Sequence, residues 1–272
     1  MKYQRAFTLV ELIIVIVLTG IIGVSMMVFF KPTIDAYFDA RRRAEMTDIA
    51  DTALQRISRD IRSAVPNSIR PWEDIDSYCI EFVPTSGGGR YRIGRDPGSA
   101  TAQPLEPGQP TFDVLSPLSK LPEKDDWVVI GNHGPQPLYA ADSKTRAQIL
   151  DVGAANTERT ASLDIGDHPF EDGYDGRFVV VPYNEGNPAV VYVCRPDVDA
   201  AGNGTGTLSR VTRGFTPSLS SCPAGGATLA TGVSACRFSD DAQDGFLRLQ
   251  LELRESGESV ALVYGVHVSN VP

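Results

Sequence analysis

Apolar residues are concentrated in one uninterrupted run near the start of the chain. From Leu12 to Phe30 there is no charged residue, and the only polar side chains are those of Thr19 and Ser25. A run of about 20 apolar residues is long enough for a helix to span the hydrocarbon core of a membrane. The pattern therefore predicts a transmembrane helix, with one acidic residue, Glu11, directly before the uncharged run.

The helical pattern continues beyond Pro32 but becomes amphipathic. Apolar residues now recur at intervals of three and four, which is the period of one helix face. They are Ile34, Tyr37, Phe38, Ile49, Ala53, Ile57, Ile61 and Val65. Pro66 ends the pattern, because the residue before a proline avoids the α region. We expect a nearly continuous helix from about Phe7 to Ala64, about 85 Å long and kinked near Pro32, with one face packed on a globular head.

Oppositely charged residues stand four apart on the polar side of this helix. The pairs are Arg41 with Glu45 and Arg56 with Asp60. At this spacing each pair stabilises a helix by a few tenths of a kcal/mol. We expect both to form on the helix surface.

Beyond Pro66 the chain changes to short runs rich in Val, Ile and aromatic residues, separated by Gly, Pro, Asn and Asp. Such runs are typical of β-strands. They are SYCIEFV (77–83), WVVIG (127–131), RFVVVPY (177–183), AVVYVCR (189–195) and LSRVTR (208–213). The head is therefore expected to be rich in β-structure.

The last part of the head has the clearest alternation. Four leucines alternate with polar residues, the four residues ESGE follow, and a second run then places five apolar side chains on one face. These residues are Leu247, Leu249, Leu251 and Leu253, then Val260, Leu262, Tyr264, Val266 and Val268. The pattern predicts an antiparallel hairpin whose apolar side packs on the amphipathic helix face. A long helix docked on antiparallel sheet is an α+β fold.

Other stretches of the head lack a strand pattern. Residues 94–125 are rich in Pro and Gly, and residues 140–176 are polar and acidic, so we expect both to be long loops. The glycine-rich SGGGR (86–90) lacks the Lys-Ser/Thr of a phosphate-binding loop. We expect it to be a turn before a strand.

Charge is distributed unevenly along the chain. The net charge is -9, yet residues 1–65 carry nine Lys/Arg against seven Asp/Glu, so the remainder is close to -11. Nucleic-acid phosphates require the opposite sign on a protein surface. The acidic head therefore argues against a nucleic-acid partner.

The four cysteines, Cys79, Cys194, Cys222 and Cys236, all follow the apolar run and show no CxxC spacing. This excludes common zinc-finger and thioredoxin-like patterns and favours two disulfides in an oxidising compartment, with buried free thiols as the alternative. Of the three possible pairings we favour Cys222 with Cys236 and Cys79 with Cys194. The first would close CPAGGATLATGVSAC, an apparent loop with little else to hold it.

Candidate chemistry in the head is sparse. Asp197, Asp199 and Asn203 have a weak likeness to an oxygen-rich calcium loop, but no glutamate closes the loop, and GNGTG is typical of a hairpin tip. We therefore assign no metal site and keep calcium there as the weaker alternative. No GxSxG or HExxH is present, and the three histidines form no evident triad, so we expect no catalytic residues and no enzymatic activity.

The opening residues distinguish between kinds of membrane anchor. A secretory signal peptide would be followed by an Ala-x-Ala-like cleavage site, which the sequence lacks. An ordinary single-span anchor explains the hydropathy alone. The stretch RAFTLVELIIVIVLTGIIG (5–23), however, resembles the signal of type IV prepilins and pseudopilins. The resemblance implies cleavage by a prepilin peptidase between Ala6 and Phe7, followed by N-methylation of Phe7. The usual residue before the cut is Gly, and the helix-kinking proline usually falls earlier than Pro32.

The resemblance also suggests why a glutamate adjoins the apolar run. Cleavage would create a positive α-amino group on Phe7, and a carboxylate beside an ammonium costs less to bury than either group alone. In a filament the family pattern implies that Glu11 meets the amine of a neighbouring subunit and sets the axial register. Alternatively, Glu11 lies among lipid headgroups at a helix N-terminus, where the dipole favours it.

Three further stretches resemble the minor pilins of mannose-sensitive haemagglutinin (MSHA) type IV pili. They are ALQRISRDIRSAVPNSIR (53–70), CRFS (236–239) with the strand that follows, and ESGESVALVYGVHVSNVP (255–272). The J-type minor pseudopilins of type II secretion are the alternative family. Either resemblance implies two antiparallel sheets packed on the C-terminal half of the helix and a structural subunit that primes or caps a filament. An adhesin at the filament tip is a third possibility, which paired exposed aromatic residues on loops would favour.

The domain organisation follows from these features. We expect a leader peptide at residues 1–6, a transmembrane segment at 7–31, an amphipathic continuation at 32–65 and a periplasmic head at 66–272. The implied location is the bacterial inner membrane and then the pilus. The implied partners are the prepilin peptidase, other minor and major pilins, and the membrane itself.

Overall fold

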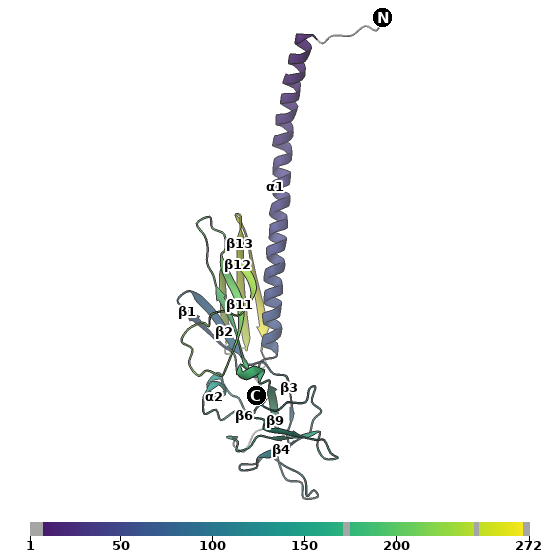
Figure 1. The fold of residues 1–272 in the computed structure, drawn as a ribbon, viewed down its shortest axis with the longest axis vertical. Helices are drawn as coiled ribbons and strands as arrows, with labels where there is room; N and C mark the ends of the chain where they lie inside the picture. The colour runs from purple at the N-terminus through teal and green to yellow at the C-terminus, as the bar shows by residue number, and fades with distance from the viewer. Residues whose placement is uncertain (1–7, 171–174, 242–244, 269–272) are drawn as a thin grey trace.

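A computed structural model describes residues 8–170, 175–241 and 245–268. Figure 1 shows a long rod, the helix α1, with a β-rich head beside and below its C-terminal half. The head has two parts. We call the large sheet and the helix segment that it covers the proximal lobe (residues 46–82 and 189–267), and the two smaller sheets the distal lobe (residues 87–181).

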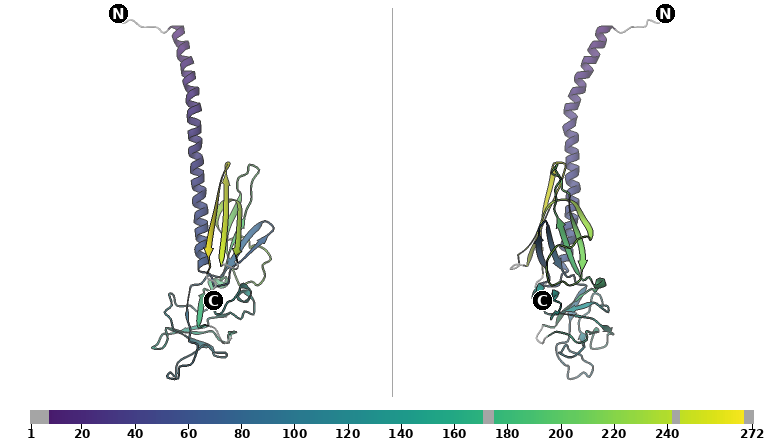
Figure 2. Two further views of the ribbon diagram at one scale, coloured as in Figure 1. Left: turned by 180° about the vertical axis from the view of Figure 1, so that it is seen from behind. Right: turned by 60° about the vertical axis from the view of Figure 1, so that its left-hand side comes forward.

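The helix α1 runs without interruption from Leu9 to Arg62. At 1.5 Å per residue its 54 residues extend about 80 Å. Pro32 lies inside the helix, and in place of the expected kink Figures 1 and 2 show one continuous helix with a gentle curve. A proline inside a helix crowds the carbonyl four residues before it, and a gentle curve spread over several turns relieves this crowding.

Only the C-terminal third of α1 packs on the head. Its buried residues are Met46, Ala50, Ala53, Leu54, Ile57, Ser58 and Ile61. The expected packing of Ile34, Tyr37, Phe38 and Ile49 is wrong, because these side chains are 39 % or more exposed. The head first meets the helix near Arg43, which pairs with Glu258, so the residues before it have no sheet to pack on. Ile49 lies beside the buried stripe rather than on it.

The large sheet is antiparallel throughout, with strand order β1-β2-β10-β11-β12-β13-β14. Its strands are β1 (Arg70–Asp74), β2 (Ser77–Phe82), β10 (Ala189–Arg195), β11 (Gly206–Arg213), β12 (Ala227–Asp241), β13 (Phe246–Glu255) and β14 (Glu258–His267). The helix contacts β12, β13 and β14. One core contains the buried helix stripe and inward side chains of β2 and β10–β14. The predicted α+β fold is confirmed.

The β13–β14 hairpin forms as its alternation predicts. Leu247, Leu249, Leu251 and Leu253 are all buried, and the strand pairing runs in register up to Glu255 opposite Glu258. Ser256 and Gly257 form the turn with φ values of 51° and 83°. Positive φ at both central residues gives the backbone twist that a two-residue hairpin needs.

The strand β12 was not predicted from the sequence. Its Ala, Thr, Ser and Gly residues were interpreted as a loop, yet they form a 15-residue strand between β11 and β13. Pairing with β11 and β13 stabilises this strand, although its local sequence has little β-propensity. This strand decides the disulfide connectivity.

The favoured disulfide pairing is wrong. The bonds join Cys79 to Cys222, with Cα atoms 6.0 Å apart, and Cys194 to Cys236, with Cα atoms 6.6 Å apart. Cys222 precedes β12, whereas Cys236 lies ten residues into it. The sheet separates the two pairs, because Cys194 and Cys236 belong to the core that faces the helix, whereas Cys79 and Cys222 lie in a cluster on the opposite face.

The distal lobe contains two small antiparallel sheets. One has the order β3-β9-β5-β6 and the other β4-β8-β7. Their strands are β3 (Gly87–Arg90), β4 (Thr111–Val114), β5 (Trp127–Val129), β6 (Arg146–Gln148), β7 (Asp151–Gly153), β8 (Ala161–Asp164) and β9 (Arg177–Val181). A short helix α2 (Pro135–Tyr139) and a 3₁₀ turn, η1 (Asn184–Gly186), complete the elements.

Three expectations for this region need correction. The stretches 94–125 and 140–176 are not simply loops, because they contain β4, β6, β7 and β8, which are too short to show a clear period. The glycine run is the strand β3 itself, where a side chain on Gly89 would lie 2.6 Å from Ser116 Oγ. The two small sheets lie beyond the end of α1 and not against it (Figure 1), so a single sheet packs on the helix.

Candidate functional site

The N-terminal turn of α1 contains the acidic residue that the sequence singled out. Thr8 is the N-cap, and its Oγ1 accepts a hydrogen bond from the Glu11 backbone N–H at 3.3 Å. Glu11 thus lies in the first turn, where the helix dipole favours a negative charge. Within the residues that the structure describes, its carboxylate has no ion-pair partner. Ala6 and Phe7, the expected cleavage pair, lie outside the described residues.

The next turns of α1 present a fully apolar surface. Every Leu, Ile, Val, Met and Phe from Leu9 to Phe30 is at least 50 % exposed. The hydroxyls of Thr19 and Ser25 donate back to the carbonyls of Val15 and Ile21 at 2.6 and 2.8 Å. Because these hydroxyls form hydrogen bonds within the helix, neither of them would face lipid without a hydrogen-bond partner. The helix is long and apolar enough to cross a membrane.

Polar contacts fix the other end of α1 to the sheet. Asp60 Oδ2 accepts from Tyr192 Oη at 2.6 Å and from Arg210 Nε at 3.2 Å, and Asp51 accepts from Tyr264 Oη. Burial, followed by the adjacent Asp60, raises the pKa of Tyr192 above its ordinary range. The expected Arg56–Asp60 pair is therefore wrong, because the sheet provides Asp60 with closer partners.

Ion pairs surround the helix where the head begins. Arg41 Nε lies 2.8 Å from Glu45 Oε1, as the spacing predicts, while Arg43 pairs with Glu258 at the start of β14. The hydrogen bond from Arg43 lowers the pKa of the Glu258 carboxyl. Arg43 and Glu258 thus join the helix to the β13–β14 turn.

The proximal lobe contains a buried ion triad that the sequence did not reveal. Glu81 is fully buried and binds Arg70 Nε at 2.6 Å and Arg213 Nε at 2.7 Å. Arg70 also donates to the carbonyls of Thr216 and Pro217. Since the bonded residues are far apart in the sequence, no local signal could have identified the group. It fastens the segment leading to Cys222 onto the outer face of the sheet.

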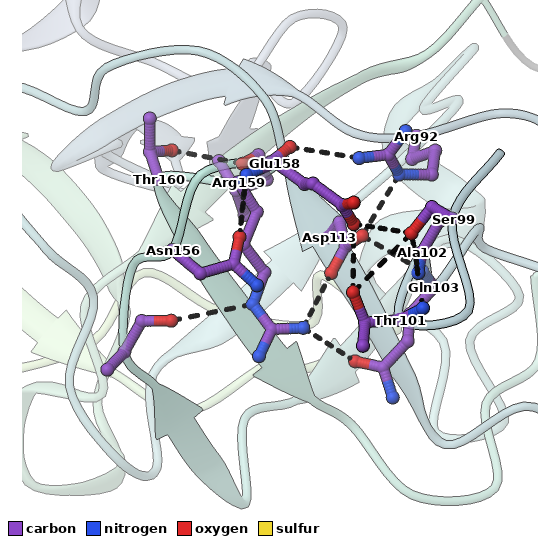
Figure 3. A network of polar contacts seen from close by, with 12 residues as sticks. Arg92, Ser99, Thr101, Ala102, Gln103, Asp113, Asn156, Glu158, Arg159 and Thr160 are labelled. Atoms are coloured by element: carbon purple, nitrogen blue, oxygen red, sulfur yellow. Dashed lines mark hydrogen bonds and ion pairs between the residues drawn. The ribbon is translucent and has the colours of Figure 1, made fainter. Parts of the chain in front are cut away.

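The distal lobe repeats this arrangement. Asp113, also fully buried, lies 2.9 Å from Arg92 Nε and 3.0 Å from Arg159 Nη1. Figure 3 shows these three residues among hydroxyl and amide groups from neighbouring loops. There Glu158 accepts from Ser99 and Thr101, which lowers the pKa of Glu158. The network holds together loops that have little regular structure.

The weak calcium candidates lie together at the β10–β11 connection. Asp199 accepts from the backbone N–H of Ala201 and from both the backbone and side-chain nitrogens of Asn203, while Asp197 accepts from the Thr205 hydroxyl. These bonds shape the turn and lower the pKa of Asp199. In the described part of the chain, no group of three or more His, Cys, Asp or Glu residues is placed to hold a metal.

The tryptophans bear on the adhesin alternative. Trp72 in β1 and Trp127 in β5 are both partly buried, and the indole nitrogen of each is buried. They lie on different sheets and do not form an exposed pair on loops. The tryptophans therefore do not form the exposed aromatic pair that would favour a tip adhesin.

Comparison with known protein families identifies a sequence motif at the N-terminal end of the chain. Residues 1–27 match the family model described as the prokaryotic N-terminal methylation motif. No curated protein and no solved structure matches the chain. Together with the long apolar helix packed on an antiparallel head, the motif supports a membrane-anchored protein of the type IV pilin and pseudopilin class. The family match does not extend to the head.

Proposed function

We propose that this chain is a minor pilin, a non-catalytic subunit that primes or caps the assembly of an MSHA-type type IV pilus. The observation that carries the proposal is the methylation motif at residues 1–27, continuous with an exposed apolar helix. The three stretches quoted above resemble MshO within that system. The distal lobe adds bulk beyond the end of α1 (Figure 1), which is easier to accommodate at a filament end than along a packed shaft.

The proposed assembly step depends on Glu11. The prepilin peptidase cuts before Phe7, and the N-methylated amine becomes a cation at the start of the helix. Glu11, in the first turn of α1, compensates such a cation in its own chain or in a neighbouring pilin. Because an unpaired carboxylate in the membrane costs about 2.5 to 3.5 kcal/mol on insertion scales, the pairing favours assembled subunits.

The proposed location is the inner membrane with the head in the periplasm. The two disulfides support this orientation, because such bonds persist in oxidising compartments. A J-type minor pseudopilin of type II secretion shares the architecture and is the second candidate. Other minor pilins and the major pilin are the proposed partners in either system.

The first test is a mass measurement on the membrane-extracted protein, with and without the host prepilin peptidase. A chain that begins at N-methyl-Phe7 only when the peptidase is present supports the proposal. A chain that begins at Met1 in both strains contradicts it. Loss of surface pili in a deletion strain, with secretion unchanged, then separates the pilus role from the pseudopilin role.

A further inference from the structure

One arginine of the distal lobe lacks the carboxylate partner that comparable arginines have. Arg146 lies on β6, the edge strand of the four-stranded sheet, and is partly buried. Its guanidinium carbon lies 4.1 Å from the ring centre of Phe215 and 5.4 Å from that of Trp127. The guanidinium thus lies against aromatic rings rather than in open water.

The hydrogen bonds of Arg146 are few for its degree of burial. Its Nη1 donates to the Leu138 carbonyl in α2, and its Nε is buried with no acceptor. A guanidinium has five N–H donors, and the described residues provide one acceptor, the Leu138 carbonyl. Burial alone lowers the pKa of Arg146 to about 10. The protein desolvates this cation without supplying a compensating charge.

Several other buried or partly buried arginines of this protein do have a carboxylate partner. Arg70 and Arg213 share Glu81, and Arg92 and Arg159 share Asp113. The nearest parallel in the described residues is Arg195, which also lacks a carboxylate but donates to two carbonyls, at 2.8 and 3.2 Å. Arg146 therefore makes fewer hydrogen bonds to the described residues than Arg195 does.

A groove opens onto Arg146. It has a volume of about 430 Å³, within the range of pockets for small ligands, and its lining includes Trp127, Arg146, Gln148, Leu150 and Asp167. Leu150 is 48 % exposed and offers an apolar contact at the rim. Asp142 and Asp167 are exposed rim residues that form no ion pair with Arg146. Their charge disfavours ligands with several negative groups.

The geometry points to a binding groove for a single carboxylate that carries an apolar group, such as the C-terminal end of a polypeptide. The planar guanidinium matches the two oxygens of a carboxylate, and charge-assisted bonds of this kind are strong in a partly desolvated site. The apolar group contacts Leu150. This site is separate from the helix and from the proposed assembly contacts of Glu11.

The test uses the full-length protein in detergent micelles with Trp72→Phe, which leaves Trp127 as the single tryptophan. The probes are the tripeptide acetyl-Ala-Ala-Leu with a free carboxylate, the same peptide amidated, and isovalerate. We expect a saturable change in Trp127 fluorescence with the free carboxylate and binding at least about tenfold weaker for the amide. Equal binding of the two peptides, or no saturable response to any carboxylate, would overturn the proposal.

Matched variants locate the effect. Arg146→Gln is expected to abolish the response, while Arg195→Gln keeps it. If Arg146→Gln fails to fold by circular dichroism, Asp167→Asn takes its place: removal of a rim charge should tighten carboxylate binding severalfold, and unchanged binding contradicts the assignment. Tighter binding of the peptide than of isovalerate identifies a polypeptide end as the ligand, and equal binding identifies a small acid.

Discussion

The proximal and distal lobes bury the same kind of ion triad but are otherwise built differently. Around Glu81 the proximal lobe has strands of up to 15 residues, two disulfides and a helix that shares its core. Around Asp113 the distal lobe has strands of three to five residues and its own apolar core, and no disulfide joins its described residues. Where strands are too short to bury a continuous face, a polar network joins the loops instead (Figure 3).

Removing the disulfides should produce the largest difference in stability between the proximal and distal lobes. Replacing Cys79 and Cys222 by Ser removes a cross-link between residues that are 143 positions apart in the sequence. On the chain-entropy model this should lower the free energy of unfolding by about 5 kcal/mol. Replacing Cys194 and Cys236, separated by 42 residues, should cost about 4 kcal/mol. Urea unfolding in micelles measures both. Hydrogen exchange should show strands β4 and β8 still protected in each variant, because they lie in the separate core of the distal lobe, and loss of their protection would contradict this prediction.

Neutralising each buried carboxylate should affect its own lobe more than the other lobe, which it meets through a shared apolar cluster that includes Val83, Val129 and Tyr139. Glu81→Gln leaves Arg70 and Arg213 buried without a counter-charge, which should destabilise the proximal lobe by about 3 to 5 kcal/mol. Asp113→Asn should do the same to the distal lobe. Hydrogen exchange read by mass spectrometry should rise in β1, β2, β10 and β11 for the first variant and in β4 and β8 for the second.

Glu45→Gln is the matched control for both carboxylate variants. Glu45 is paired with Arg41 on the exposed helix surface, so its loss should change stability by less than about 1 kcal/mol. Equal exchange changes in both lobes from either buried-site variant would show that the lobes unfold as one unit.

A smaller effect should distinguish the two ends of α1. Ile57→Ala removes a fully buried side chain from the proximal core and should cost about 2 to 5 kcal/mol. Leu18→Ala, in the exposed apolar segment, should leave the unfolding of the head unchanged. Thermal unfolding followed by near-ultraviolet circular dichroism measures both. A head destabilised by Leu18→Ala would mean that the membrane segment also supports the sheet.

The smallest effect should be a pH dependence at the helix–sheet contact. Because the folded state raises the pKa of Tyr192, the stability it contributes is fully present below about pH 10, the ordinary tyrosine value, and is lost as pH rises further. Tyr192→Phe should cost about 1 to 2 kcal/mol at neutral pH by removing the bond to Asp60, and the difference from the parent should narrow above about pH 10. Urea midpoints across this pH range test the prediction.

The exposed Tyr183 supplies a control for the loss of a hydroxyl, since Tyr183→Phe should change the free energy of unfolding at neutral pH by less than about 0.5 kcal/mol. Burial also raises the pKa of Tyr139, so some alkaline loss of stability should persist in Tyr192→Phe. A gap between parent and Tyr192→Phe that stays constant with pH would contradict the role assigned to Tyr192.

Much of the fold could be predicted because it rests on local periodicity and composition. The helix through Ile61 and the β13–β14 hairpin show repeats of 3.6 and 2 residues, whereas hydropathy marks the apolar run and Val, Ile and aromatic content marks five strands. The prediction failed where the repeat was short or weak, as in β4, β6, β7 and β8, or where composition concealed it, as in β12. At the N-terminal site, Glu11 could be placed near a helix start from the sequence, whereas the Thr8 N-cap is seen only in the structure and the pair Ala6 and Phe7 rests on the motif alone.

By itself the sequence determined the anchor, because hydropathy and the methylation motif are properties of neighbouring residues. Tertiary structure alone decided which cysteines pair, which carboxylates the arginines share and how far along α1 the head packs. These contacts join positions up to 215 residues apart, as between Arg43 and Glu258, and depend on where the strands bring them. A strand such as β12 gains its stability from its neighbours on both sides, so its existence, and with it the disulfide connectivity, could be known only from the folded chain.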